Sequence, residues 1–208
     1  MAEPCWIGRD DPGPFVPGIP EAVPRYRSVG KLNDDMACCT RCDLAPFRTQ
    51  VVRGAGAKRA RVLFLGEAPG ASEDRAGEPF VGAAGGLLAR LLEEAGLERS
   101  EVYITNVVAC RPPKNRTPRV AEIRAHAPWL EEQLRLVRPV VVVTLGRVAL
   151  TWFIPKARIT ELSGTAQVIE WDGGQLRILP LFHPAAALRS PDLLPRLEAG
   201  FAALRSML

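Results

Sequence analysis

The stretch Arg61-Val-Leu-Phe-Leu-Gly-Glu-Ala-Pro-Gly70 determines how the rest of the chain is organised. Residues 61–65 are largely apolar, which is typical of a short strand buried inside an α/β sheet. The glycines and proline that follow predict a sharp turn. In open α/β sheets, ligands bind at the carboxyl ends of the strands. This turn therefore predicts a site that contains Glu67, with Glu73 and Asp74 just after it.

Apolar runs and helical patterns alternate along the remainder of the chain. We expect strands at 61–65, 102–108 and 140–145, a hairpin made of 165–170 and 176–181, and an edge strand at 48–53. We expect helices from near Asn33 towards the cysteines, at 83–95, from Pro118 to Val137, after Gly146, and from Asp192 to the end. Strands that alternate with helices predict a three-layer α/β/α sandwich around a mostly parallel central sheet.

The length and composition favour one domain. A chain of 208 residues, 47% hydrophobic, can form a single core. Residues 1–30 are rich in proline and have little periodicity, so we expect an irregular N-terminal extension before a domain at 31–208. The chain contains no apolar run of membrane-spanning length and no charged-then-apolar leader, which predicts a cytoplasmic protein.

The basic residues are mostly arginine. The formal net charge is only +4, but 23 of the 27 basic residues are Arg and four are Lys. Arginine suits forked contacts with phosphate. An arginine bias also follows from genome base content, so composition by itself favours nucleic-acid binding only weakly.

Five cysteines are an odd number in a chain without secretory features. Structural disulfides are therefore not expected. The spacing Cys39-Thr-Arg-Cys42 instead indicates metal binding or redox chemistry.

Three separated blocks, GEAPGASEDRAGEPFVGAAG, TNVVACRPPKNRTP and FHPAAALR, resemble the family 4 uracil-DNA glycosylases, which carry an iron–sulfur cluster. The resemblance covers roughly residues 37–208, and the blocks stand in the family's order. It implies the uracil-DNA glycosylase fold in a monomer that acts on single- or double-stranded DNA. It also implies a monofunctional enzyme that flips uracil out of DNA, hydrolyses its N-glycosidic bond and so initiates base excision repair.

The resemblance supplies candidates for holding the base. Phe80 would stack on uracil, and the Asn106 amide would donate to O4 and accept from N3–H, a pattern that cytosine reverses. His183 would donate to O2 as negative charge develops, and it can do so as a neutral imidazole. Gly66 and Ala68 of the turn would complete the uracil site.

The carboxylates leave two interpretations open. Glu67, where some other glycosylase families have an Asp, and Glu73 would position water and stabilise positive charge on the sugar. Alternatively, Glu67 lies near uracil C5 with Ala68 and excludes the methyl group of thymine. For Glu73 and Asp74, the simpler interpretation is that they solvate a turn or the start of a helix.

The metal site departs from the family. Cys39, Cys42 and Cys110 match three cluster ligands, but His126 occupies the position of the fourth cysteine. The resemblance implies a [4Fe–4S] cluster, with His126, Cys38, Cys5 or an exogenous group as the fourth ligand. A Cys₃His set also suits zinc. Cys38 is otherwise expected to be a small apolar filler.

Three segments are candidates for contacting DNA: the backbone amides of the turn 66–70, the loop 111–116 and residues 185–190. The side chains expected to do so are Arg111, Lys114, Arg116, Leu188 and Arg189, with either Leu188 or Arg189 as a wedge for the space that the base vacates. A solvated basic loop is the alternative interpretation of 111–119. A covalent uracil-binding branch of the superfamily has a His in this loop. This chain has none there, which implies turnover, and no Lys is placed for a lyase step.

Two rival functions remain from the sequence. One is a glycosylase with a broader choice of base, such as hypoxanthine or ethenocytosine. The other is a non-catalytic iron–sulfur protein that senses DNA damage. The presence of Asn106, His183 and Glu67 argues against the second.

Overall fold

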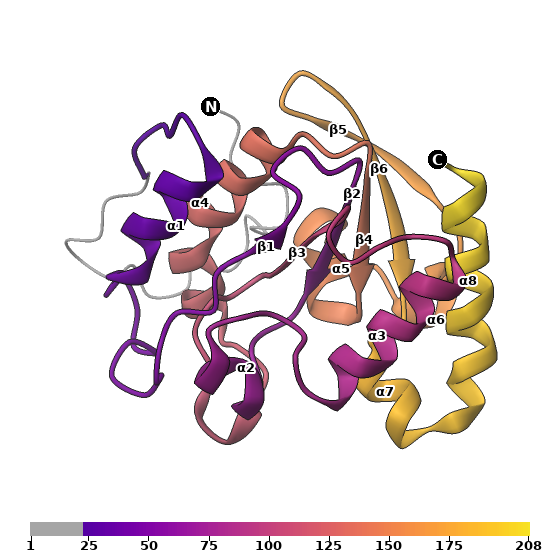
Figure 1. The fold of residues 1–208 in the computed structure, drawn as a ribbon, viewed down its shortest axis with the longest axis horizontal. Helices are drawn as coiled ribbons and strands as arrows, with labels where there is room; N and C mark the ends of the chain where they lie inside the picture. The colour runs from indigo at the N-terminus through magenta and orange to yellow at the C-terminus, as the bar shows by residue number, and fades with distance from the viewer. Residues whose placement is uncertain (1–22) are drawn as a thin grey trace.

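In the computed structural model, which describes residues 23–208, one mixed sheet lies between two layers of helices (Figure 1). In this part of the chain the strands are β1 (Ala55–Gly56), β2 (Val62–Gly66), β3 (Tyr103–Asn106), β4 (Val141–Leu145), β5 (Gln167–Trp171) and β6 (Gly174–Leu181). Their order in the sheet is β1-β3-β2-β4-β6-β5.

The inner strands are parallel and the two edges are antiparallel. β2 pairs with β3 on one side, with Gly66 opposite Asn106, and with β4 on the other side. β6 continues the parallel set next to β4, while β1 and β5 pair antiparallel at the edges. Every residue of β2, β3 and β4 is buried, as expected for strands covered on both faces. The predicted mostly parallel sheet and the hairpin are confirmed.

Helices cover both faces. The α-helices within residues 23–208 are α1 (Val29–Ala37), α2 (Ala71–Ala76), α3 (Ala83–Glu94), α4 (Val120–Val137), α5 (Arg147–Phe153), α6 (Ile159–Leu162), α7 (Pro184–Arg189) and α8 (Leu194–Ser206). Short 3₁₀ turns occur at Pro113–Asn115 and Pro191–Leu193. α1, α4 and α5 contribute to one core cluster, and α3, α7 and α8 to the other. This arrangement is the predicted three-layer sandwich.

The predicted helix near Asn33 was wrong in its bounds. α1 begins at Val29 because the Ser28 side chain caps it by accepting from the Lys31 amide. It ends before the cysteines, which lie in the turns that follow. Residues 23–28, the described part of the expected irregular extension that precedes α1, pack on the core: Tyr26 is buried, and its amide donates to Glu132. Residues 1–22, including Cys5, lie outside the described part.

Three further local predictions differ from the structure. Residues 48–53 do not form a strand; β1 begins at Ala55, and the Arg48 side chain turns inward towards Cys39 and Cys110. Cys38 is exposed at the end of α1, so it does not fill the core. The helix expected from Pro118 begins at Val120, because the Glu122 carboxylate caps the Arg119 amide.

None of the helices in residues 23–208 is long and apolar enough to cross a membrane.

Candidate functional site

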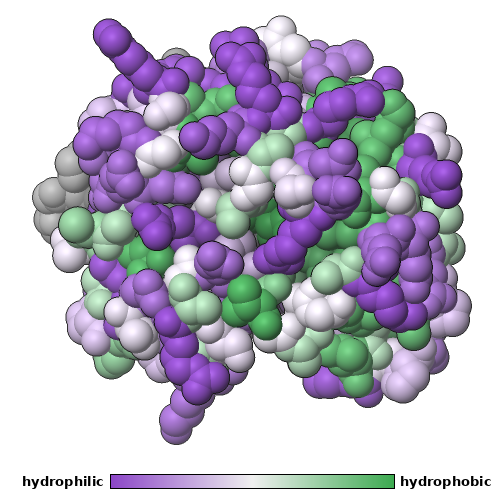
Figure 2. Space-filling model, viewed as in Figure 1, coloured by the Kyte–Doolittle hydropathy of each residue, from purple (hydrophilic) through white to green (hydrophobic). Residues whose placement is uncertain are grey.

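The carboxyl ends of the parallel strands bring three of the predicted base-binding residues together. Gly66 ends β2, Asn106 ends β3 directly opposite it, and His183 comes two residues after β6. Figure 1 shows α2, α3 and α7 gathered at this edge of the sheet, at the bottom of the view. In the space-filling view the outline is notched here, between the α2 side and the side of α3 and α7 (Figure 2).

Phe80 enters this group in a strained conformation. Its φ is +54°, a left-handed value that is costly for a residue with a Cβ. Its ring stacks on His183 with centroids 5.5 Å apart and an angle of 25° between the planes. The turn of α3 packs so closely that a Cβ on Gly85 would lie 1.9 Å from the Phe80 carbonyl oxygen. The surrounding backbone therefore fixes the ring.

Gly66 allows the other side chains to meet. A Cβ at this position would lie 2.3 Å from Asn106 Oδ1 and 2.8 Å from the Phe80 ring. Both neighbours are nearly buried, at 5% and 7% exposure, so neither can easily move away. A glycine is required at the end of β2 because an amide and an aromatic ring occupy the space of its side chain.

The protonation state of His183 follows from its surroundings. Its Nδ1 accepts a hydrogen bond from the Ala185 amide at 3.1 Å, so in the neutral ring the proton is on Nε2. Burial lowers the pKa of His183 to about 4, and Arg189 acts in the same direction while Glu73 opposes it. The imidazole is therefore neutral at pH 7 and offers an N–H donor.

The Glu73 carboxylate is committed to backbone amides. Oε2 accepts from the Gly70 amide at 3.1 Å, and Oε1 accepts from Val81 at 3.1 Å and Gly82 at 2.8 Å. These bonds join the turn after β2 to the segment on either side of Phe80. Because these three amides occupy both oxygens, the Glu73 carboxylate has little capacity left to bind a water molecule.

Glu67 has a different environment. It is half-buried in the turn beside Ala68, and its carbonyl accepts from Val108 at 3.2 Å. Burial raises the pKa of the Glu67 carboxyl, while the Thr117 hydroxyl and the nearby charge of Arg147 lower it. This carboxylate has no set of backbone amides like that of Glu73, so it is the better candidate for proton chemistry.

The basic side chains of the loop between β3 and α4 differ in their exposure and in their partners. Lys114 is exposed, and Arg111 donates to Asn115 Oδ1 at 2.8 Å. Arg116 instead forms a forked ion pair with the buried Glu122, whose Oε2 lies 2.8 Å from its Nη1. The Arg116 guanidinium is thus already paired. On the other side of the site, Leu188 and Arg189 are exposed on α7, with Leu188 at 50%.

The predicted metal ligands come from three elements and meet on the α1–α4 side. Cys42 Sγ lies 3.9 Å from His126 Nδ1, and Cys110 is close enough to hydrogen-bond Cys42. Cys39 Sγ accepts from Trp129 Nε1 at 3.3 Å, one helical turn beyond His126. In residues 23–208, no three His, Cys, Asp or Glu side chains converge on one point that could hold a single metal ion.

The donors in this cluster suit a thiolate-binding group. The hydrogen bond from Cys110 lowers the pKa of Cys42 to about 4, against the effect of burial, and His126 adds to the lowering. His126 Nδ1 lies 2.8 Å from the Glu122 carbonyl oxygen. Because a carbonyl only accepts, Nδ1 carries the proton and Nε2 keeps its lone pair. A metal would therefore have to bind at Nε2, although Nδ1 is the ring nitrogen that lies 3.9 Å from Cys42 Sγ.

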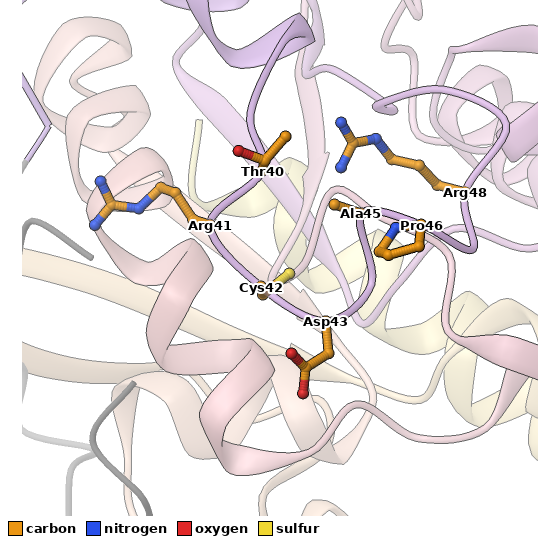
Figure 3. A pocket seen from close by; sticks show the side chains of 7 residues that line it. All are labelled: Thr40, Arg41, Cys42, Asp43, Ala45, Pro46 and Arg48. Atoms are coloured by element: carbon orange, nitrogen blue, oxygen red, sulfur yellow. The ribbon is translucent and has the colours of Figure 1, made fainter. Parts of the chain in front are cut away.

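An open pocket of about 530 Å³ adjoins Cys42 (Figure 3). It is lined by Thr40, Arg41, Cys42, Asp43, Ala45, Pro46 and Arg48. The Cys42 sulfur points into the curl of this segment, whereas the Arg41 and Asp43 side chains point away.

Four side chains, Cys39, Cys42, Cys110 and His126, form what we call the cysteine cluster. Sequence reasoning missed two residues that contact it. Arg48 donates to Cys110 Sγ at 3.4 Å and to the Cys39 carbonyl at 2.6 Å. No pattern marks this arginine among the 23 in the chain. Trp129, in contrast, follows His126 at the i+3 spacing that places two residues on one helix face, and this signal was available.

Comparison with known proteins gives a consistent result. The family model "Uracil DNA glycosylase superfamily" matches residues 53–204. The chain is 42% identical over 186 residues to a "Type-4 uracil-DNA glycosylase" of Sulfurisphaera tokodaii, covering 86% of this chain and 84% of the relative. It is 47% identical over 154 residues to a protein of the same name from Thermotoga maritima, covering 73% and 79%. A "Type-5 uracil-DNA glycosylase" of Thermus thermophilus matches 50% of the chain at 43% identity.

Proposed function

The chain belongs to the uracil DNA glycosylase superfamily, and we propose that it is a monofunctional uracil-DNA glycosylase that initiates base excision repair. The base must leave the helix, since its glycosidic bond is shielded inside a duplex. Water then adds to C1′, and the bonding electrons leave with N1, giving the uracil anion and an abasic site. The observation that carries the proposal is the group of Phe80, Asn106 and His183 around Gly66.

Base recognition rests on two side chains that the fold holds still. The Phe80 face would stack on the flipped base, which any base could satisfy. The choice of uracil then depends on Asn106, whose amide matches O4 and N3–H. Cytosine would leave this buried amide mispaired, which costs on the order of 1–3 kcal/mol.

His183 would stabilise the departing base. Its Nε2–H would donate to O2, where negative charge accumulates as the glycosidic bond breaks. The low pKa, about 4, supports a neutral donor throughout the physiological range.

Glu67 would act on the sugar side by positioning the attacking water and taking up its proton. The support is its half-buried carboxylate and its raised pKa. Glu73, also predicted from the sequence as catalytic, fits a positioning role better because three backbone amides occupy its oxygens.

DNA would lie across the edge of the sheet at which the strands end. Arg111 and Lys114 on one side, and Leu188 and Arg189 on the other, would contact it. Arg116 fits this role less well, since its guanidinium is paired with Glu122. We expect the enzyme to act as a monomer.

The cysteine cluster fits a [4Fe–4S] group with Cys39, Cys42, Cys110 and His126 as ligands. A cubane cluster takes one ligand per iron, so its ligands surround a volume and need not converge on one ion. The support is the lowered pKa of Cys42, its contact with His126, and the N–H groups of Trp129 and Arg48 directed at two of the sulfurs. When bound, the group would fasten three chain segments; glycosidic hydrolysis requires no electron transfer.

The activity is tested with an oligonucleotide that contains one uracil. The purified protein should release free uracil and leave a site that alkali cleaves, without strand cleavage before alkali. Hypoxanthine and ethenocytosine oligonucleotides test the broader base choice. Binding without release of any base would reject a glycosylase and favour a damage sensor.

A further inference from the structure

Two neighbouring carboxylates on the short helix α2 bind different parts of the protein. Glu73 accepts from the backbone on both sides of Phe80, as described above. Asp74 points the other way and is only 2% exposed. Its Oδ1 accepts from the Thr49 amide at 2.9 Å, and its Oδ2 accepts from the Thr49 hydroxyl at 2.7 Å. A buried carboxylate is costly without such partners, so this contact is a specific one.

Thr49 belongs to a segment, residues 48–50, that we call the strap. Arg48 attaches one end of the strap to the cysteine cluster, through the Cys39 carbonyl and Cys110 Sγ. Gln50 attaches the other end to the last turn of α2, since its Nε2 donates to the Arg75 carbonyl at 2.7 Å. The strap therefore lies between the cysteine cluster and α2, and Asp74 binds its middle residue.

On its other side, α2 contacts the segment that contains the strained residue Phe80. Phe80 keeps its left-handed φ while Glu73 accepts from the amides of Val81 and Gly82. Strained backbone of this kind persists only where the surroundings over-determine it. A shift of α2 would move the Glu73 oxygens and release the ring of Phe80 from its place beside His183.

We propose that Asp74 is a positioning residue for uracil excision, which locks α2 to the strap through Thr49 and thereby keeps the Phe80 ring in its base-stacking position. The proposal rests on the function proposed above. Asp74 acts through α2 and Phe80 and does not touch the substrate. Misplacing a reacting or stacking group by about 1 Å is enough to slow an enzyme up to about 10²-fold.

Four substitutions separate hydrogen bonding from charge. Thr49→Val removes only the hydroxyl bond and keeps the shape, whereas Thr49→Ser keeps the bond. Asp74→Ala removes both bonds. Asp74→Asn removes the charge but keeps both bonds, because its Oδ1 accepts from the Thr49 amide and its Nδ2 donates to the hydroxyl oxygen. Thr165→Val, on the exposed hairpin side of the protein, is the matched control.

The readouts are the single-turnover rate on uracil DNA at saturating enzyme, the Kd for abasic DNA, and the folded fraction from thermal unfolding. Thr49→Val and Asp74→Ala should slow excision about tenfold per folded molecule, with the double variant no slower than Asp74→Ala. Thr49→Ser, Asp74→Asn and Thr165→Val should stay within about twofold of the parent rate.

Three results would overturn the proposal: parent rates in Thr49→Val and Asp74→Ala, losses that only follow the unfolded fraction, or Asp74→Asn as slow as Asp74→Ala. In each case a parent enzyme that still excises uracil leaves the proposed function intact. A parent protein without excision activity would reject the function itself.

Discussion

Two groups of side chains are built in different ways. One is the proposed base-binding group (Gly66, Phe80, Asn106 and His183), and the other is the cysteine cluster. Gly66 and Asn106 sit opposite each other at the ends of paired strands, and His183 and Phe80 stack beside them. The cysteine cluster instead joins a turn segment after α1, the loop after β3 and a face of α4, through N–H···S and S–H···S contacts. The first group is rigid without a ligand, while the second depends on soft contacts that a bound cluster would strengthen. Substitutions should therefore act on catalysis in one group and on cofactor lifetime in the other.

Among the substitutions that probe this contrast, Glu67→Gln is expected to have the largest effect after Asn106→Ala. If the carboxylate positions the water, single-turnover excision should fall about 10²-fold while thermal stability changes little. Because glutamine has nearly the same shape as glutamate, we expect the variant to fold like the parent. A normal uracil rate together with new cleavage of thymine would instead identify Glu67 as a gatekeeper against the methyl group.

Gly66→Ala tests the rigidity of the base-binding group directly. The new Cβ would overlap Asn106 and Phe80, so we expect at least a tenfold loss of excision from displaced base contacts. Gly86→Ala is the control, since a Cβ there meets nothing within 4 Å. Equal rates in the two variants would show that the group is softer than its packing implies.

The cysteine cluster should respond through its cofactor. Anaerobically purified protein should be brown and hold about four irons and four sulfides per chain. His126→Ala should shorten the lifetime of the cluster in air several-fold, and His126→Cys should preserve it, because thiolate is the usual ligand. An unchanged lifetime in His126→Ala would move the fourth ligand to Cys38, Cys5 or an outside group. One zinc per colourless chain would reject the cluster.

The smallest effects are expected in the pH dependence. The raised pKa of Glu67 means that its active, ionised form is lost as pH falls, at a higher pH than for an ordinary Glu. Thr117→Val removes a group that lowers this pKa, so the acid limb of the rate profile should move to higher pH. His183, with a pKa of about 4, should contribute nothing to the profile above pH 6. If the acid limb of the rate profile persists in Glu67→Gln, that limb belongs to another titratable group.

Sequence patterns were sufficient for the inner strands of the sheet. The apolar runs of β2, β3 and β4 are buried on both faces, so they are continuous and easy to recognise. The family blocks then supplied Phe80, Asn106 and His183, whose role in binding a base stays a prediction.

Contacts between segments far apart in the sequence were not predictable in this way. We expected an edge strand at residues 48–53, but tertiary contacts of Arg48 and Thr49 decide the conformation of this segment. Glu73 has the position of a catalytic carboxylate, and only the fold shows that backbone amides occupy it. Arg48 and Asp74 have partners 9 to 62 residues away, for which a single sequence carries no signal.

Asn106→Ala tests the central claim most directly, because this residue is the one proposed to read the base. The measurement compares the single-turnover rate of uracil release with the Kd for abasic DNA of the same sequence, in the parent and in the variant. Since the amide contacts the base alone, excision should fall about 10²–10³-fold, while abasic-DNA binding should change less than about threefold. Uracil release at the parent rate would contradict the assignment of the base-binding group.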